Sequence, residues 1–317
     1  MRVIVEFLLI YFVLGFSDSL GERKTRKMST DKLARTLQSL AGLSVGDAFG
    51  QRFFTLPPHI IRSRQIPEGT WSWTDDTHMA LSIVQVLLTY GAIHQDELAR
   101  LFGLRFIQEP WRGYAGGAQR LLIQYSQGVD WRDQAPRLFN GGSYGNGGAM
   151  RAAPIGAYFT SDPERAAAEA RKSAAVTHAH PEGQAGAIAV AAMAAIVSSP
   201  LQPMGVALLR EVLAYVPASK TREGIVEATR IDPNEHQRAI AVLGTGDQVA
   251  AFDTVPYCLW IVAHHAPDYE TALWTTVAGL GDRDTTCAIV GGIIALSTTI
   301  PAEWLKRREA LPRGFEV

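Results

Sequence analysis

Cysteine is scarce in this sequence, which has 317 residues but only two thiols, Cys258 and Cys287, both inside apolar runs. Two cysteines cannot build a disulfide framework, so the sequence suits a reducing compartment and predicts a cytoplasmic protein. Net charge is nearly absent as well, with 30 Lys and Arg against 31 Asp and Glu. A general nucleic-acid scaffold would show a basic excess, so the balance argues against that class of partner.

Hydrophobic runs long enough to span a membrane are also missing. The apolar stretch of residues 1–16 is short for a span, contains Glu6 and is not followed by an Ala-x-Ala cleavage site. We therefore expect no stable membrane association. We expect translation to begin at Met28 and the first helix at Ser29–Asp31. Residues 1–27 would then be an N-terminal extension, with a targeting segment as the alternative, and residues 28–317 one domain.

Alternating strand patterns and hairpin signals do not occur, whereas helical spacing does. Apolar residues after Asp76 recur at the intervals of one helix face, and residues 164–175 and 183–198 are rich in alanine. Five further segments read as helix: 205–215, 234–243, 254–265, 268–278 and 284–297. Proline and glycine cluster between helices, at 50–70, 110–117, 140–156 and 179–186. The sequence predicts a single all-α domain with long loops gathered at a functional face.

Two acidic clusters, residues 74–77 and 281–286, each precede an apolar helix. Capping a helix dipole would explain either cluster taken alone. A cap needs one such residue, however, and each cluster supplies two carboxylates. Four carboxylates packed together would repel one another unless cations lay among them. Oxygen ligands of this kind suit magnesium or manganese, and the lack of histidine argues against zinc.

Three glycine-rich or histidine-bearing segments could hold an anionic ligand. The loop 141–151 has five glycines in its first eight positions, which suits a phosphate cradle made of backbone N–H groups or a flexible connector. The segment 177–183 contains two histidines, His178 and His180, and a histidine beside that loop would donate to a diphosphate or a ribose. The segment could equally be a surface turn. The turn 113–117 would be another ligand loop or simply a turn.

These segments together resemble the ADP-ribosylglycohydrolase family, in the family's order and over about residues 37–296. The resemblance is carried by five motifs: Gly46–Gly50, Thr74–Thr77, Ser143–Arg151, Thr177–His178 and Gly281–Thr286. The third motif is especially similar to the branch that acts on ADP-ribosyl-serine and related O-linked esters.

The resemblance implies a helical bundle with two magnesium or manganese ions in a central cleft. It implies these metal ligands: Thr74, Asp75, Asp76, Asp282, Asp284 and Thr285. It implies these contacts to ADP-ribose: Ser143, Tyr144, Gly145, Asn146 and His178. The implied reaction removes ADP-ribose from a modified protein or another conjugate. Water activated by the metals would attack C1″ of the distal ribose, with Asp75 or Asp284 orienting it.

Two positions depart from the family pattern. Phe54 stands where relatives carry a glutamate thought to act on the water or the metal, and Glu68 is the nearest downstream carboxylate. Arg283 stands between two aspartates, where relatives often have a small residue. It would pair with a carboxylate, reach a phosphate or point to solvent. Phe54 keeps open a catalytically weak or inactive ADP-ribose binder, and a phosphatase is the third hypothesis.

Overall fold

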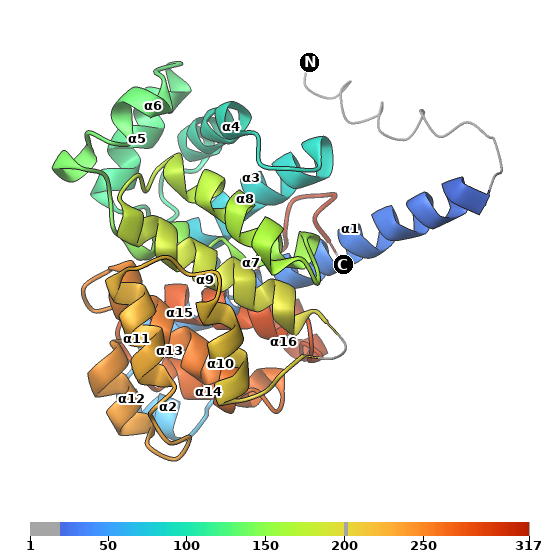
Figure 1. Cartoon of the computed structure of the whole chain (residues 1–317). Coiled ribbons are helices and arrows are strands. Elements are labelled where there is room, and N and C mark those ends of the chain that lie inside the picture. The colour runs from blue at the N-terminus through green and yellow to red at the C-terminus, as the bar shows by residue number, and fades with distance from the viewer. Residues whose placement is uncertain (1–19, 200–201, 317) are drawn as a thin grey trace.

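The computed structural model describes residues 20–199 and 202–316, and within them the chain folds into helices, turns and loops (Figure 1). The described part holds no strand, only isolated bridges between Trp71 and Arg308 and between Gly145 and Ala250. The prediction of a single all-α domain is therefore confirmed. None of the helices in this part of the chain combines the length and the apolar character that crossing a membrane requires.

The α-helices follow in chain order as α1 (Leu20–Gln51), α2 (Pro58–Arg62), α3 (Asp75–Tyr90), α4 (Gln95–Gln108), α5 (Gly116–Ser126), α6 (Trp131–Gln134), α7 (Ala153–Tyr158), α8 (Pro163–Ala175), α9 (Pro181–Val197), α10 (Val206–Leu213), α11 (Lys220–Ala228), α12 (His236–Leu243), α13 (Ala251–His264), α14 (Tyr269–Val277), α15 (Arg283–Ile294) and α16 (Ala302–Arg307). The 3₁₀ helices among the described residues are short: η2 (Arg52–Phe54), η3 (Leu138–Asn140) and η4 (Asn146–Gly148).

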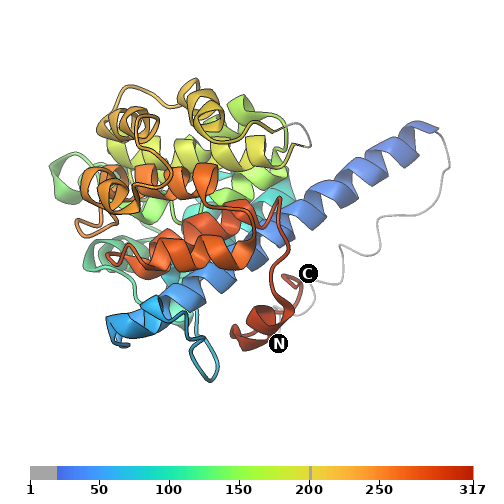
Figure 2. The same cartoon turned by 90° about the horizontal axis from the view of Figure 1, so that it is seen from below.

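Helix α1 projects from the body at its N-terminal end and runs through the body at its C-terminal end (Figures 1 and 2). It begins at Leu20, so the prediction of a first helix starting at Ser29–Asp31 is wrong. Residues 22–31 contain neither proline nor glycine, so nothing in the backbone stops the helix there. Residues 1–19 of the expected extension lie outside the described residues.

Glycines allow α1 and α15 to lie against each other. Gly46 and Gly50 are one turn apart on α1, and a Cβ atom on them would overlap the backbone carbonyls of Cys287 and Arg283. On the facing helix, a Cβ on Gly291 would lie 2.6 Å from the carbonyl oxygen of Gly42. Only glycine, which has no Cβ atom, permits so close an approach of the two backbones. The glycines therefore set the distance between the helices.

An aromatic cluster anchors the C-terminal end of α1. The ring of Phe49 lies 4.5 Å from that of Trp304, 4.9 Å from that of Trp274 and 5.6 Å from that of Trp71, measured between centroids. All four side chains are buried. Stacked and edge-on contacts of this kind add to the free energy gained from burying the rings. The cluster therefore fixes the segment before α3 against α1, α14 and α16.

Candidate active site

Three aspartates from three helices meet at the centre of the molecule. Asp47 of α1, Asp76 of α3 and Asp284 of α15 each offer a carboxylate oxygen, and these oxygens lie within 4.8 Å of one another. One member of each predicted acidic cluster is thus present, so the expectation that the two clusters converge is confirmed for Asp76 and Asp284. Asp47 had no predicted role, although its motif was recognised. An aspartate between glycines on a closely packed helix face is the signal that would have found it.

Asp47 holds the first turn of α3. Its carboxylate accepts hydrogen bonds from the backbone N–H of Thr74 at 2.9 Å and of Thr77 at 3.1 Å, and from the Thr77 hydroxyl at 2.5 Å. The Thr74 hydroxyl lies 2.8 Å from Asp47 Oδ1 and 3.0 Å from Asp76 Oδ2. A side chain from another helix therefore caps α3, while its own N-cap residue joins two carboxylates.

The acidic groups do not tolerate full ionisation in this arrangement. Burial, followed by the charge of Asp47, raises the pKa of Asp75 to about 7, and burial raises that of Asp47 to about 6. Burial and neighbouring carboxylates also raise the pKa of Asp76 and of Asp284 well above the ordinary range. The acidic cage formed by Asp47, Asp76 and Asp284 is therefore stabilised when it binds either protons or cations.

The glycine loop joins the second acidic cluster directly. The side-chain amide of Asn146 donates to Asp282 Oδ2 at 2.7 Å and lies 3.1 Å from the Thr254 hydroxyl. Asp282 precedes α15 as its N-cap residue, and the Asp284 carboxylate accepts from the backbone N–H of Thr285 at 2.9 Å. The hydrogen bond from Asn146 to Asp282 thus connects the two predicted halves of the site, the acidic residues and the ligand loop.

A cavity of about 480 Å³ opens over these groups. Its lining includes both acidic clusters and the glycine loop, through these predicted residues: Asp75, Asp76, Asp282, Asp284, Thr285, Ser143, Tyr144, Gly145, Asn146 and His178. Thr74 is buried behind the lining. Gly113, Ala115 and Gly117 of the short glycine turn also contribute. The size is in the range of cavities that bind nucleotide-sized ligands.

The glycine loop is held in place by backbone pairing. Asn146 N–H donates to the carbonyl of Val249 at 3.1 Å, and Ala251 N–H donates to that of Tyr144 at 3.0 Å. Ser143 Oγ accepts from Gly145 N–H at 3.1 Å. These bonds place the loop against the segment before α13, so it is a fixed element of the cavity wall rather than a flexible connector.

Two exposed aromatic rings stand in the cavity lining, those of Phe139 and Tyr144. Phe139 has a φ of 54°, an uncommon value for a residue with a side chain. The residue is 60% exposed. Phe139 had no predicted role, and the signal that would have found it is its place just before the glycine loop.

A chain of hydrogen bonds favours one tautomer of His178. Arg151 Nη2 donates to the Thr177 hydroxyl at 2.7 Å, and that hydroxyl lies 2.8 Å from His178 Nδ1. A guanidinium only donates and a hydroxyl has one hydrogen, so every group is satisfied when Thr177 donates to Nδ1. Burial and the charge of Arg151 lower the pKa of His178 to about 3, which keeps the ring neutral. His178 then carries its hydrogen on Nε2, beside the glycine loop.

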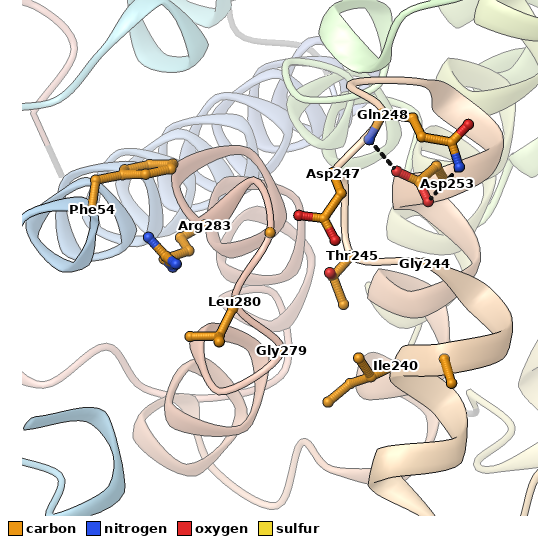
Figure 3. A pocket seen from close by; sticks show the side chains of 12 residues that line it. Phe54, Ile240, Gly244, Thr245, Asp247, Gln248, Asp253, Gly279, Leu280 and Arg283 are labelled. Carbon is orange, nitrogen blue, oxygen red and sulfur yellow. Dashed lines mark hydrogen bonds between the residues drawn. The ribbon is translucent and has the colours of Figure 1, made fainter. Parts of the chain in front are cut away.

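The two departures from the family pattern lie together, as Figure 3 shows. The Arg283 guanidinium lies 4.9 Å from the centre of the Phe54 ring, and Arg283 Nη1 is 3.3 Å from the carbonyl oxygen of Phe53. The described contacts of Arg283 are a ring and a carbonyl and include no ion pair with a carboxylate, whereas a contact with a phosphate or with solvent stays a prediction. Glu68 does not line the cavity over the acidic residues.

Comparisons with known proteins identify the family of the chain. Residues 28–315 match the family described as ADP-ribosylglycohydrolase. The chain is 28% identical to the ADP-ribosylhydrolase ARH3 of Homo sapiens, over 90% of each protein, and 29% identical to that of Mus musculus, over 78% of this chain and 75% of the mouse protein.

A solved structure, titled "ADP-ribosylglycohydrolase-related protein complex", superposes with a TM-score of 0.63 at 23% identity. The match covers 88% of this chain and 94% of that one, and at this identity it establishes the shared fold. The family match spans nearly all of the described residues and contains every residue of the acidic cage. The chain belongs to the ADP-ribosylglycohydrolase family.

Proposed function

We propose that this chain is a metal-dependent hydrolase that removes ADP-ribose from a modified protein or another ADP-ribosyl conjugate. The observation that carries the proposal is the carboxylate cage at the floor of a cavity whose wall is a fixed glycine loop. The names of the ARH3 relatives support the same substrate class. The two buried, unpaired cysteines are consistent with the predicted cytoplasmic location.

The cage suits two magnesium or manganese ions. Its converging atoms are all carboxylate oxygens, and Asp76 Oδ1 is buried without a hydrogen-bond partner among the described residues. An unpaired buried carboxylate oxygen is costly unless a cation satisfies it. The proposed ligands are those of the sequence prediction (Thr74, Asp75, Asp76, Asp282, Asp284 and Thr285), with Asp47 added. When bound, the ions would lower the pKa of water and offset the repulsion among the carboxylates.

The rest of the cavity fits ADP-ribose. Backbone N–H groups of the glycine loop and the Nε2 hydrogen of His178 suit the diphosphate. The exposed rings of Phe139 and Tyr144 suit stacking on the adenine. We place the distal ribose over the acidic cage, because its hydroxyl groups suit a polar part of the lining.

In the proposed reaction water attacks C1″ of the distal ribose, the bond from C1″ to the partner breaks, and the departing oxygen or nitrogen of the partner takes up the proton that the water loses. Asp75 is partly exposed and lines the cavity, so it can accept a hydrogen bond from that water, and Asp284 lines the same floor. The positive charge that develops on the ribose would be stabilised by the nearby carboxylates. Binding of the diphosphate by the loop would position the reacting bond.

The test is release of free ADP-ribose from ADP-ribosylated serine, arginine and nucleic-acid substrates in the presence of Mg²⁺. We expect release from at least one of them and loss of release when EDTA is added. No release from any of the three, with cations shown to be bound, would contradict the proposal. Phosphate release from simple monoesters instead would favour a phosphatase.

Phe54 supports a second candidate function, the binding of ADP-ribose without cleavage. The side chain is exposed and stacks on Arg283, so no carboxylate occupies this position beside α15. Calorimetry with ADP-ribose separates the two functions, because a binder holds the ligand but turns over no conjugate. The variant Phe54→Glu should then gain turnover. A wild-type chain that already turns over would exclude the binder.

A further inference from the structure

Figure 3 shows a second cavity, of about 700 Å³, whose lining adjoins that of the acidic one. It is formed by α12, the turn that follows α12, the turn before α15, and η2. Residues that matter for its chemistry are Phe54, Ile240, Asp247, Leu280 and Arg283. The proposed reaction uses none of them.

The two cavities share a wall. Along the start of α15 the lining residues alternate, because Gly281 and Arg283 line the second cavity while Asp282 and Asp284 line the acidic one. Gln248 lines both. A group attached to a ribose over the acidic cage therefore has the second cavity as its neighbour.

The chemistry of the second cavity suits a basic side chain. Asp247 is exposed, and Figure 3 shows its carboxylate pointing toward the Gly279–Arg283 turn. The neighbouring Asp253 is different, because it accepts from the backbone N–H of Gln248 at 2.7 Å and is already engaged. Ile240 and Leu280 add apolar surface of the kind that the stem of a lysine or arginine covers.

Arg283 provides the opposite charge in the same cavity. Its guanidinium lies beside the Phe54 ring, and its Nε atom is buried without a hydrogen-bond partner among the described residues. Arginine has five N–H donors, and the described contacts leave most of them for an acceptor such as a peptide carbonyl. A free carboxylate and a guanidinium in one cavity favour a polypeptide over a uniformly charged ligand.

We propose that the second cavity binds the polypeptide from which ADP-ribose is removed, with a lysine or arginine side chain of that polypeptide against Asp247. The proposal rests on the proposed function, because it needs the ribose over the acidic cage. Asp247 and Arg283 are then specificity-determining residues, distinct from the residues that hold ADP-ribose and the cations.

The experiment reverses the charge of one residue in the substrate peptide and of one residue in the protein. Two labelled peptides carry an ADP-ribosylated serine flanked by Lys in one and by Glu in the other, and a small ADP-ribosyl conjugate without a peptide serves as the third substrate. We compare binding by fluorescence anisotropy and kcat/KM for the wild type, for Asp247→Lys and for the control Asp133→Lys. Asp133 is exposed on α6 and lines neither cavity.

We expect the wild type and Asp133→Lys to prefer the Lys peptide by about threefold to fivefold, the range for one partly exposed ion pair. Asp247→Lys should reverse the preference and leave the small conjugate unaffected. An unchanged preference in Asp247→Lys, or equal loss on all three substrates, would overturn the inference. If the wild type binds the peptides but cleaves nothing, the proposed reaction fails and the reversal in affinity alone decides the inference. Binding of neither peptide also overturns it.

Discussion

Asp76 places Oδ1 in a buried position where none of the described residues donates a hydrogen bond to it. Replacing the carboxylate by an amide keeps the shape but removes the charge that a cation needs. We predict that Asp76→Asn lowers turnover by at least about 100-fold and abolishes the rise in melting temperature on adding Mg²⁺. Turnover assays and differential scanning fluorimetry measure both effects, with Asp133→Asn as the control. A variant that keeps its Mg²⁺ response would contradict the metal assignment of Asp76.

Thr177 acts through His178, because its hydroxyl links Arg151 to Nδ1 of the imidazole. We predict the Nε2–H tautomer in the wild type and in Thr177→Ser, and a mixture of tautomers in Thr177→Val. Affinity for ADP-ribose should fall about fivefold in Thr177→Val only, as expected for one hydrogen bond. Long-range ¹H–¹⁵N spectra of the imidazole report the tautomer. Observation of Nδ1–H in the wild type would show that the hydrogen-bond chain runs in the other direction.

At the scale of the element, the packing of α1 on α15 depends on glycine. A Cβ on Gly46 would overlap the carbonyl group of Cys287, which is backbone and cannot move aside cheaply. We predict that Gly46→Ala lowers the free energy of unfolding by about 1–3 kcal/mol. Gly116→Ala is the matched control, since a Cβ there meets nothing within 4 Å. Denaturant unfolding measures both, and equal stability of the two variants would mean that the helices separate without cost.

The helices themselves follow sequence periodicity to different degrees. The predicted segments 164–175, 254–265 and 284–297 correspond to α8, α13 and α15 within a few residues at each end. In contrast, α4 and α11 were not predicted. Both carry charged residues through much of their length, which weakens the apolar pattern that marks a helix. The contact between α1 and α15, which builds the cage, is marked in the sequence by glycines one turn apart on α1 (Gly42, Gly46 and Gly50), but their spacing does not say which helix they meet.

At the scale of the whole molecule, binding of cations should depend on pH. In the cation-free chain the pKa of Asp47 is about 6 and that of Asp75 about 7, against 3.8 for the ordinary group. Between pH 3.8 and about pH 7 the folded chain therefore binds more protons than the unfolded chain. Their contribution to stability is present at low pH and is lost as the pH rises through about 7.

Cations replace those protons, so Mg²⁺ should raise the melting temperature more at pH 8 than at pH 5. Scanning fluorimetry with and without Mg²⁺ at both pH values measures the difference, and the comparison cancels the titration of groups that Mg²⁺ does not touch. An equal or larger effect at pH 5 would contradict the raised pKa values. Asp76→Asn, which should not respond to Mg²⁺ at either pH, is the control.

The amino-acid sequence by itself determined the all-α class, the two acidic helix starts, the glycine loop and the family. These features are local, because helical periodicity, capping residues and glycine spacing are written within short windows. Only the tertiary structure decided that Asp47 completes the cage, that Phe139 lines the cavity and that Arg283 turns to Phe54 beside a second cavity. Periodicity says which face of a helix is buried, but not which other face it meets, and that contact places side chains from distant segments within a few ångströms.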